Sequence, residues 1–186
     1  APKLAKAVQI HLRTLAMAHA VVEVSVGDDT GDEVTFLLAA NPGSPPLPLT
    51  KVASGGELAR TMLALRLVLT QGPSTLVFDE VDAGIGGEAA VAVAGALAQL
   101  GNRHQVLVVT HLAQVAAAAH RQIRVSKTVK SKQTFAEASE LADQDRVGEI
   151  ARMLSGGMAE EAALNYASEL LKASSDRSSI QRRTRR

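Results

Sequence analysis

The chain has 186 residues, of which 46% are hydrophobic and only 2% aromatic. This length suits one domain with a core of Ala, Val and Leu, and so few aromatic rings argue against a single-strand nucleic-acid surface built by stacking. The absence of cysteine excludes disulfides, thiolate zinc sites and cysteine nucleophiles. The net charge is +1, and removing the five arginines of the last ten residues leaves about −4 for the rest. Bulk charge therefore does not indicate nucleic-acid binding.

No hydrophobic run approaches the roughly 18 residues of a membrane span. Residues 1–6 lead into an amphipathic pattern rather than into the apolar stretch of a secretory signal. We therefore expect a cytoplasmic protein without a membrane partner. Because the chain starts without Met inside a predicted helix, we interpret it as a fragment.

The first predicted elements are a helix and a hairpin. Residues 3–17 place apolar side chains at helical spacing. Residues 21–26 and 33–38 are typical of two strands, and the acidic, glycine-containing residues 27–32 between them predict a turn. Residues 41–48 hold four of the six prolines, which predicts no regular structure there.

The middle of the chain predicts a strand–helix–strand unit. Residues 58–69 form a preceding helix, and residues 75–78 and 106–109 are short apolar runs expected of strands buried on both faces. Residues 88–100 form an Ala-rich helix between these strands. Such a connection makes the two strands parallel with a right-handed crossover.

The C-terminal part predicts a second hairpin and two helices. The hairpin strands are residues 123–129 and 134–136, and the helices lie around residues 140–154 and 159–172. From Ala173 on, Ser and Arg dominate, which predicts disorder.

Polar residues end both predicted parallel strands. Asp79 and Glu80 follow the first strand and His111 follows the second, and the carboxyl ends of parallel strands meet at one edge of a sheet. Asp79 is suited to hold Mg²⁺ through its water shell, and Glu80 to orient or deprotonate water. His111 is suited to donate to a phosphate. Alternatively, the two carboxylates cap the next helix or face solvent, and the lone histidine is structural.

Two Ser-Gly-Gly turns flank predicted helices. Ser54-Gly55-Gly56-Glu57 comes directly before a helix, where glycines and free N–H groups can receive an anion. The alternative is a capping box, which has the same Ser-x-x-Glu spacing. The second turn, Ser155-Gly156-Gly157, is predicted to be a helix C-terminus.

The order and spacing of these motifs resemble the ABC ATPases. Within that group, KVASGGEL (51–58), FDEVDAGIGG (78–87) and VTHLAQVA (109–116) resemble the RecN family of bacterial DNA-repair proteins, which belongs to the SMC branch. The resemblance extends from the N-terminal helix to about residue 172.

The resemblance implies an α/β fold, the C-terminal lobe of an ABC-type P-loop NTPase head with a parallel βαβ core and flanking hairpins and helices. Residues 1–17 would be the end of a coiled coil or a linking helix, residues 18–172 the C-terminal half of the head, and residues 173–186 a disordered basic tail. The intact protein would hydrolyse ATP with Mg²⁺, dimerise with a second head around ATP, and act on DNA in double-strand break repair and recombination. It would be nucleoid-associated.

The resemblance also implies roles for residues. Glu80 and His111 would be catalytic and Asp79 would serve Mg²⁺ in their own head. The signature turn would bind the nucleotide of the opposing head through Ser54, Gly55, Gly56 and Glu57. A D-loop-like segment would contact the partner head through Asp82, Gly84, Gly86 and Gly87. Gly86 stands where many ABC proteins have Asp.

One motif of the family is absent. No G-x-x-x-x-G-K-[ST] phosphate-binding loop occurs. The resemblance implies that this loop lies in the N-terminal part of the gene product, beyond a long coiled coil, and that this chain alone is inactive. Two alternatives stay open: a non-catalytic dimerisation or docking module, and a head fragment of a chromosome-organising or transporter ATPase.

Two basic segments could either contact DNA or have no binding function. The first either faces DNA phosphates or is a solvated edge that discourages strand pairing, and it comprises Arg121, Arg124, Lys127, Lys130 and Lys132. The Arg-rich tail either binds nucleic acid nonspecifically or is only disordered. The acids that follow the first segment, from Glu137 to Glu149, are expected to form a solvated helix face.

Overall fold

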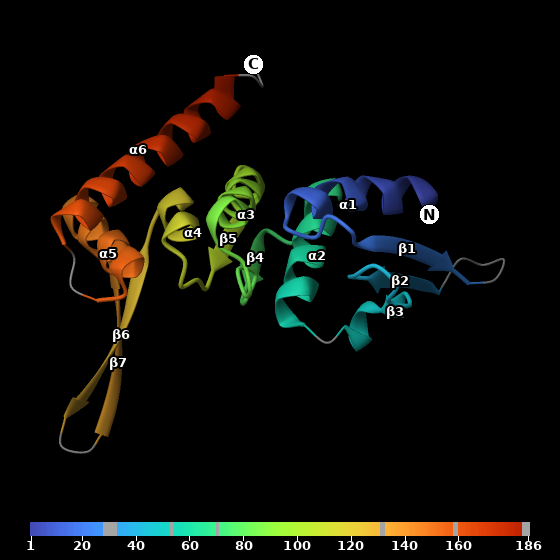
Figure 1. The fold of residues 1–186 in the computed structure, drawn as a ribbon, viewed down its shortest axis with the longest axis horizontal. Coiled ribbons are helices and arrows are strands. Elements are labelled where there is room, and N and C mark those ends of the chain that lie inside the picture. The colour runs from blue at the N-terminus through green and yellow to red at the C-terminus, as the bar shows by residue number, and fades with distance from the viewer. Residues whose placement is uncertain (28–32, 53, 70, 131–132, 158–159, 184–186) are drawn as a thin grey trace. The chain divides into compact units, whose positions relative to one another are not determined.

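The computed structural model describes residues 1–27, 33–52, 54–69, 71–130, 133–157 and 160–183 (Figure 1). The chain divides into two compact units, residues 1–110 and 111–186. Residues 18–172, treated as one body in the sequence analysis, therefore contribute to both units.

The first unit begins with a helix and the predicted hairpin. Helix α1 (Pro2–Thr14) is followed by strand β1 (Val21–Val26), which pairs antiparallel with β2 (Val34–Ala39), Val24 facing Phe36. The hairpin is confirmed, and most of its predicted acidic turn, residues 28–32, lies outside the described residues.

The proline-rich stretch departs from its prediction, because residues Leu47–Pro48 form a short strand, β3, on the edge of this sheet. Pro48 faces Leu37 of β2 in antiparallel register. An edge strand tolerates proline because the missing N–H is not needed by a further neighbour.

Helix α1 is an integral part of the first unit. It packs against β1 and against helices α2 (Gly55–Val68) and α3 (Gly87–Leu100). Val8, Leu12 and Leu15 are fully buried there. The apolar stripe that predicted this helix is therefore its core-facing side.

The predicted strand–helix–strand unit is confirmed. Strands β4 (Thr75–Phe78) and β5 (Gln105–Val108) are parallel neighbours, and α3 connects them. Helix α2 precedes β4 and begins three residues before the predicted start, because Ser54 already acts as its N-cap.

The expectation that these two strands are buried on both faces is wrong for this chain. Leu76 and Phe78 are buried, whereas Val77 is 66%, Leu107 47% and Val109 61% exposed. Since the sheet has two strands, its covered face alternates with an open one. A continuous apolar run cannot by itself show whether the second face has a cover.

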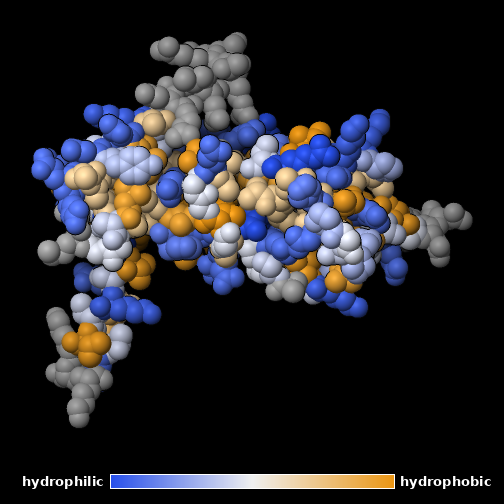
Figure 2. Space-filling view, in the orientation of Figure 1, coloured by the Kyte–Doolittle hydropathy of each residue, from blue (hydrophilic) through white to orange (hydrophobic). Residues whose placement is uncertain are grey.

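The described residues of the second unit form an extended hairpin and three helices. After α4 (Ala113–Ala118), which the sequence analysis did not predict, β6 (Ile123–Lys130) pairs antiparallel with β7 (Gln133–Glu140). Figure 2 shows hydrophobic surface on this hairpin, where Ile123, Val125, Val129 and Phe135 are at least half exposed. The hairpin is longer than predicted.

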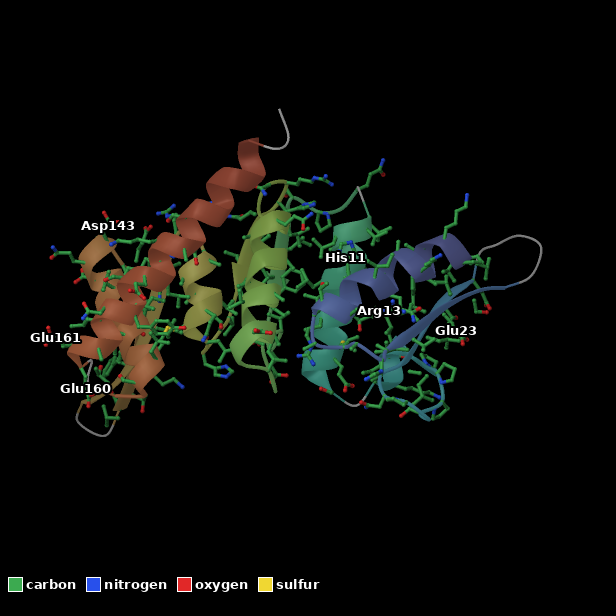
Figure 3. The ribbon with its side chains drawn as sticks, turned by 45° about the horizontal axis from the view of Figure 1, so that its top comes forward. His11, Arg13, Glu23, Asp143, Glu160 and Glu161 are labelled. Atoms are coloured by element: carbon green, nitrogen blue, oxygen red, sulfur yellow. The ribbon has the colours of Figure 1, made fainter. Side chains whose placement is uncertain are left out.

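Two helices complete the second unit, α5 (Asp143–Ser155) and α6 (Glu161–Arg183). Each has an acidic residue in its first turn, Asp143 in α5 and Glu161 in α6, where a negative charge complements the helix dipole (Figure 3). Small side chains from α4, α5 and α6 form the core, which comprises Ala113, Ala116, Ala117, Ile150, Ala151, Ala167 and Leu170.

The predicted disorder from Ala173 is not what the structure shows for residues 173–183, which continue α6. Ser174 and Ser175 donate their hydroxyls to the carbonyls of Leu170 and Leu171, one turn earlier. Serine satisfied in this way fits a helix, so composition misled the prediction. Residues 184–186 lie outside the described part.

Among the described residues, no helix combines the length and apolar character needed to cross a membrane.

Candidate functional site

The signature turn lies at the N-terminus of α2. Ser54 is the N-cap, and its Oγ accepts a hydrogen bond of 3.4 Å from the backbone N–H of Glu57. The Ser54 half of the predicted capping box is therefore present. The first turn of a helix also carries unpaired N–H groups and a partial positive charge, so capping and anion binding are compatible here.

Gly56 lies directly against the segment that follows β4. A Cβ atom on Gly56 would be 2.9 Å from the carbonyl oxygen of Ala83 and 3.2 Å from its Cβ. Such distances leave no room for a side chain, so glycine is required by close packing rather than by a positive φ. The signature turn and the residues after Asp79-Glu80 are thus side by side within one unit.

Asp79 and Glu80 are exposed and begin the segment that we call the 79–83 loop. The backbone N–H of Glu80 donates to Asp79 Oδ1 over 3.0 Å, and the N–H of Ala83 donates to the Glu80 carbonyl over 3.0 Å. Glu80 has a φ of 56°. A left-handed conformation is uncommon for a residue with a long side chain and is held by its surroundings.

The carboxylate of Glu80 reaches the signature turn of the same chain. A Cβ atom placed on Gly55 would collide with Glu80 Oε2. The structure therefore brings the two predicted motifs together. A side chain at position 55 would displace the Glu80 carboxylate. Glycine at this position therefore leaves room for that carboxylate beside the signature turn.

Asp82 is inside the protein. It is only 2% exposed, and Thr110 Oγ1 donates a hydrogen bond to its Oδ2. This contact joins the 79–83 loop to the second residue after β5. A buried carboxylate held in this way serves the loop's own position. His111, the next residue, is exposed and is the first residue of the second unit.

The D-loop-like glycines form an open surface. Cβ atoms at Gly84, Gly86 and Gly87 would meet no atom within 4 Å in the part of the chain that the structure describes. Gly84 and Gly87 have φ values of 72° and 53°, which favour glycine, whereas Gly86 is extended. The backbone of this segment is therefore accessible.

Arg60 is a buried charged residue that the sequence analysis missed. It lies on α2, is 6% exposed, and donates from Nη1 to the carbonyls of Ala83 at 2.9 Å and Val81 at 3.4 Å. Burial lowers its pKa, and the charge of Glu57 opposes that shift. In sequence, Arg60 is an ordinary charged residue within a predicted helix, and such residues usually face solvent. The role of Thr110 was also missed, because its partner Asp82 lies 28 residues away in sequence.

Asp79 fits a partial magnesium site. Among the described residues, no group of three or more histidines and acids could hold a metal. An exposed carboxylate at the end of a parallel strand is nevertheless a suitable hard oxygen ligand, because Mg²⁺ is commonly bound by one or two carboxylates, waters and substrate phosphates. Asp79 would be one such contributor.

The second unit contains the second Ser-Gly-Gly turn and the basic segment that begins at Arg121. Gly156 ends α5 with a φ of 69°, which confirms the predicted helix C-terminus at the second Ser-Gly-Gly turn. Arg121, two residues before β6, forms an ion pair with Glu140 at the end of β7. One cation of the basic stretch is therefore paired with one of the acids that follow it in sequence. Glu149, predicted to face solvent, is 7% exposed.

The chain is similar in sequence to bacterial DNA-repair proteins. It is 48% identical over 166 residues to the DNA repair protein RecN of Deinococcus radiodurans, covering 86% of this chain and 29% of the relative. It is 44% identical over 191 residues to that of Streptomyces coelicolor, covering 92% and 33%. The chain thus spans about a third of these relatives. A scan against models of protein families found no match.

Solved structures show the fold. The Smc head domain of Pyrococcus yayanosii, with a coiled coil and joint, has a TM-score of 0.57 at 19% identity, covering 79% of this chain and 28% of its own. The Smc head of Pyrococcus furiosus, bound to the C-terminal domain of ScpA, has a TM-score of 0.53 at 16% identity, covering 73% and 34%. The predicted α/β fold of an ABC-type head is therefore confirmed.

Proposed function

Because the chain belongs to the RecN family over the segment that it matches, we propose that it supplies the C-terminal half of an ATP-hydrolysing, SMC-like head. A separate N-terminal half would supply the phosphate-binding loop, whose pattern is absent from these 186 residues. The complete head would use ATP and Mg²⁺, dimerise with a second head around ATP, and act on DNA in double-strand break repair and recombination. Such a protein would be cytoplasmic and nucleoid-associated.

The observation that carries this proposal is the contact between the signature turn and the 79–83 loop. Gly56 packs on Ala83, and Gly55 meets the Glu80 carboxylate. One head thereby presents a helix N-terminus and a carboxylate pair on one surface. Two heads facing each other with these surfaces would have the groups needed for two shared nucleotide sites.

Each group has a role in ATP hydrolysis within this proposal. Glu80 orients the attacking water and accepts its proton, and His111 donates a hydrogen bond to the γ-phosphate. Asp79 helps to hold Mg²⁺, which offsets the negative charge of the phosphates when bound. The signature residues Ser54, Gly55, Gly56 and Glu57 act on the nucleotide of the opposing head.

The D-loop-like segment would have a divided role. Gly84, Gly86 and Gly87 offer accessible backbone, which suits contact with a partner head. Asp82 is buried and bonded by Thr110, so we propose that it supports this segment from within.

A second function has one observation in its favour. Val77, Leu107 and Val109 are exposed on the open face of the β4–β5 sheet. An exposed apolar face is typical of an interaction site, so the chain could dock to another protein without hydrolysing ATP.

Mg²⁺-dependent ATP hydrolysis would test the proposal. The chain is assayed alone, then with the N-terminal half, and each time with Glu80→Gln as the matched variant, which keeps the shape of the side chain and removes its charge. We expect turnover only when both halves are present, and its loss in Glu80→Gln.

Other outcomes would contradict the proposal in different ways. If the chain alone hydrolyses ATP and Glu80→Gln does so at the same rate, the catalytic site does not include Glu80. No turnover in either arrangement, with stable binding between the halves, would favour the docking module.

A further inference from the structure

Arg60 buries a positive charge beneath the 79–83 loop. Its guanidinium is fixed by two backbone carbonyls of that loop, those of Val81 and Ala83. Its Nε atom is buried and has no hydrogen-bond partner among the residues that the structure describes. The contact therefore joins α2, which begins at the signature turn, to the backbone that follows Glu80.

Packing alone does not explain an arginine at this position. Burying a guanidinium carries a desolvation penalty, and replacing buried charges by apolar side chains of similar volume is often neutral or stabilising. The lowered pKa of Arg60 has this same cause, burial. What an apolar side chain could not do is hold two carbonyls of the loop at once.

The loop is held from both sides. Arg60 binds the carbonyls on either side of Asp82, and Asp82 itself accepts a hydrogen bond from Thr110. Gly56 permits the approach, because a Cβ there would be 3.0 Å from Arg60 Nη1. Glu80, with its left-handed backbone, is at the start of this loop. An uncommon backbone conformation persists only where its surroundings determine it.

We infer that Arg60 is a positioning residue for the proposed ATP hydrolysis, on which this inference rests. It holds the 79–83 loop against α2, so that the Glu80 carboxylate is presented beside the signature turn. Arg60 acts through the loop and has no direct role in binding the nucleotide. Its removal should therefore lower kcat more than it changes KM for ATP.

Arg146 offers a matched control in the second unit. It is half-buried, its pKa is also lowered by burial, and its Nε is also buried with no hydrogen-bond partner in the described part of the chain. Its Nη2 donates to the carbonyls of Ala116, Ala117 and Ala119 at the end of α4. Arg146→Met should thus resemble Arg60→Met in lost hydrogen bonds, without touching the 79–83 loop.

The experiment compares Arg60→Met, Arg60→Lys and Arg146→Met in the complete head, this chain joined with its N-terminal half. Steady-state kinetics give kcat and KM for ATP, and thermal unfolding is measured on the same samples. A displaced catalytic group costs about a hundredfold in rate. We expect a kcat loss of that order in Arg60→Met, with KM changed less than about threefold.

Arg60→Lys should lie between wild type and Arg60→Met, because an ammonium can donate to a carbonyl but lacks the planar fork. Arg146→Met should keep the wild-type kcat. Wild-type kcat in Arg60→Met would overturn the inference, and so would kcat losses in both Met variants that follow their melting temperatures. If Arg60→Met does not fold, a lower kcat of Arg60→Lys at unchanged KM supports the inference, and a wild-type kcat overturns it.

Glu80→Gln separates this inference from the proposed function. Unchanged turnover in Glu80→Gln would refute the proposed function and with it the reason for positioning Glu80. Lost turnover in Glu80→Gln together with unchanged turnover in Arg60→Met would refute only the inference about Arg60.

Discussion

Ser54-Gly55-Gly56 and Ser155-Gly156-Gly157 share three residues but lie at opposite ends of their helices. The first begins α2, where Ser54 Oγ accepts from the Glu57 N–H. The second ends α5, where Ser155 Oγ donates to the Ala151 carbonyl over 3.0 Å and Gly156 is left-handed. The serine hydroxyl accepts a hydrogen bond at the N-terminus of α2 and donates one at the C-terminus of α5.

The two turns also differ in what surrounds them. Gly55 and Gly56 lie against Glu80 and Ala83, whereas Cβ atoms on Gly156 and Gly157 would meet no atom of the described residues within 4 Å. A helix N-terminus attracts anions, and a C-terminus repels them. The comparison teaches that a short motif acquires its chemistry from helix direction and from neighbours distant in sequence.

Gly56→Ala should give the largest effect, because its Cβ would lie 2.9 Å from the Ala83 carbonyl oxygen. We expect a stability loss of roughly 1–3 kcal/mol from overpacking. Displacement of the 79–83 loop should reduce turnover of the complete head about a hundredfold. Urea unfolding and ATP hydrolysis measure the two effects. Gly157→Ala is the control, and a loss of similar size there would break the comparison.

Ser54→Ala should lower stability by about 1 kcal/mol, because α2 loses its N-cap. In Ser155→Ala the lost bond lies within an exposed helix end, so the change should stay within about 0.5 kcal/mol. Chemical denaturation of both variants compares them directly. Equal losses would mean that the 3.4 Å contact at Ser54 contributes no more to stability than the bond of Ser155 at the exposed helix end.

Gly156→Ala should lower stability by about 1 kcal/mol, since a φ of 69° disfavours an L side chain. Gly156→Asn should lose less, because asparagine tolerates the left-handed region. Neither variant should alter ATP turnover of the complete head. An altered kcat with an unchanged melting temperature would show that this end also takes part in the reaction.

Glu149 allows a smaller, pH-dependent test near the same helix end. The Arg152 guanidinium, which donates to Glu149 Oε2 over 2.9 Å, holds the pKa of that carboxyl below its usual range. A lowered folded-state pKa stabilises the fold above the unfolded pKa of about 4.3, and this contribution is lost as pH falls through the folded value. Arg152 is more than half exposed, so we expect only about 0.5 kcal/mol.

The measurement is the stability difference between wild type and Glu149→Gln at neutral and at acid pH. The difference should be present at pH 7 and shrink below about pH 4 as the carboxylate becomes protonated. Arg121→Gln is a useful reference, because its partner Glu140 also has a lowered pKa but lies on the exposed hairpin. A difference for Glu149→Gln that is constant with pH would rule out the ion pair as its source.

Much of the fold could be predicted because its signals are local. Alternating residues and a turn predicted the β1–β2 hairpin, and two apolar runs around an Ala-rich helix predicted the parallel pair. The end of α5 was predicted from glycine, whose freedom at positive φ needs no tertiary partner. The motif order also led to the correct family and fold.

The candidate site was predictable only in part. The contact of Gly55 with Glu80 and that of Gly56 with Ala83 join positions about 25 residues apart, and no local pattern encodes them. The residues next to Arg60 in sequence do not indicate that it is buried. A charged residue on a helix usually faces solvent, whereas Arg60 is buried.

The amino-acid sequence by itself determined the C-terminus of α5, the strand pairing within hairpins and the parallel β4–β5 pair, because each depends on propensity and period over a short stretch. Only the tertiary structure decided which faces are covered. It left Val77 exposed, buried Arg60 and Glu149, and set Asp82 beside Thr110. Burial depends on which distant elements pack together, and that is a property of the whole fold.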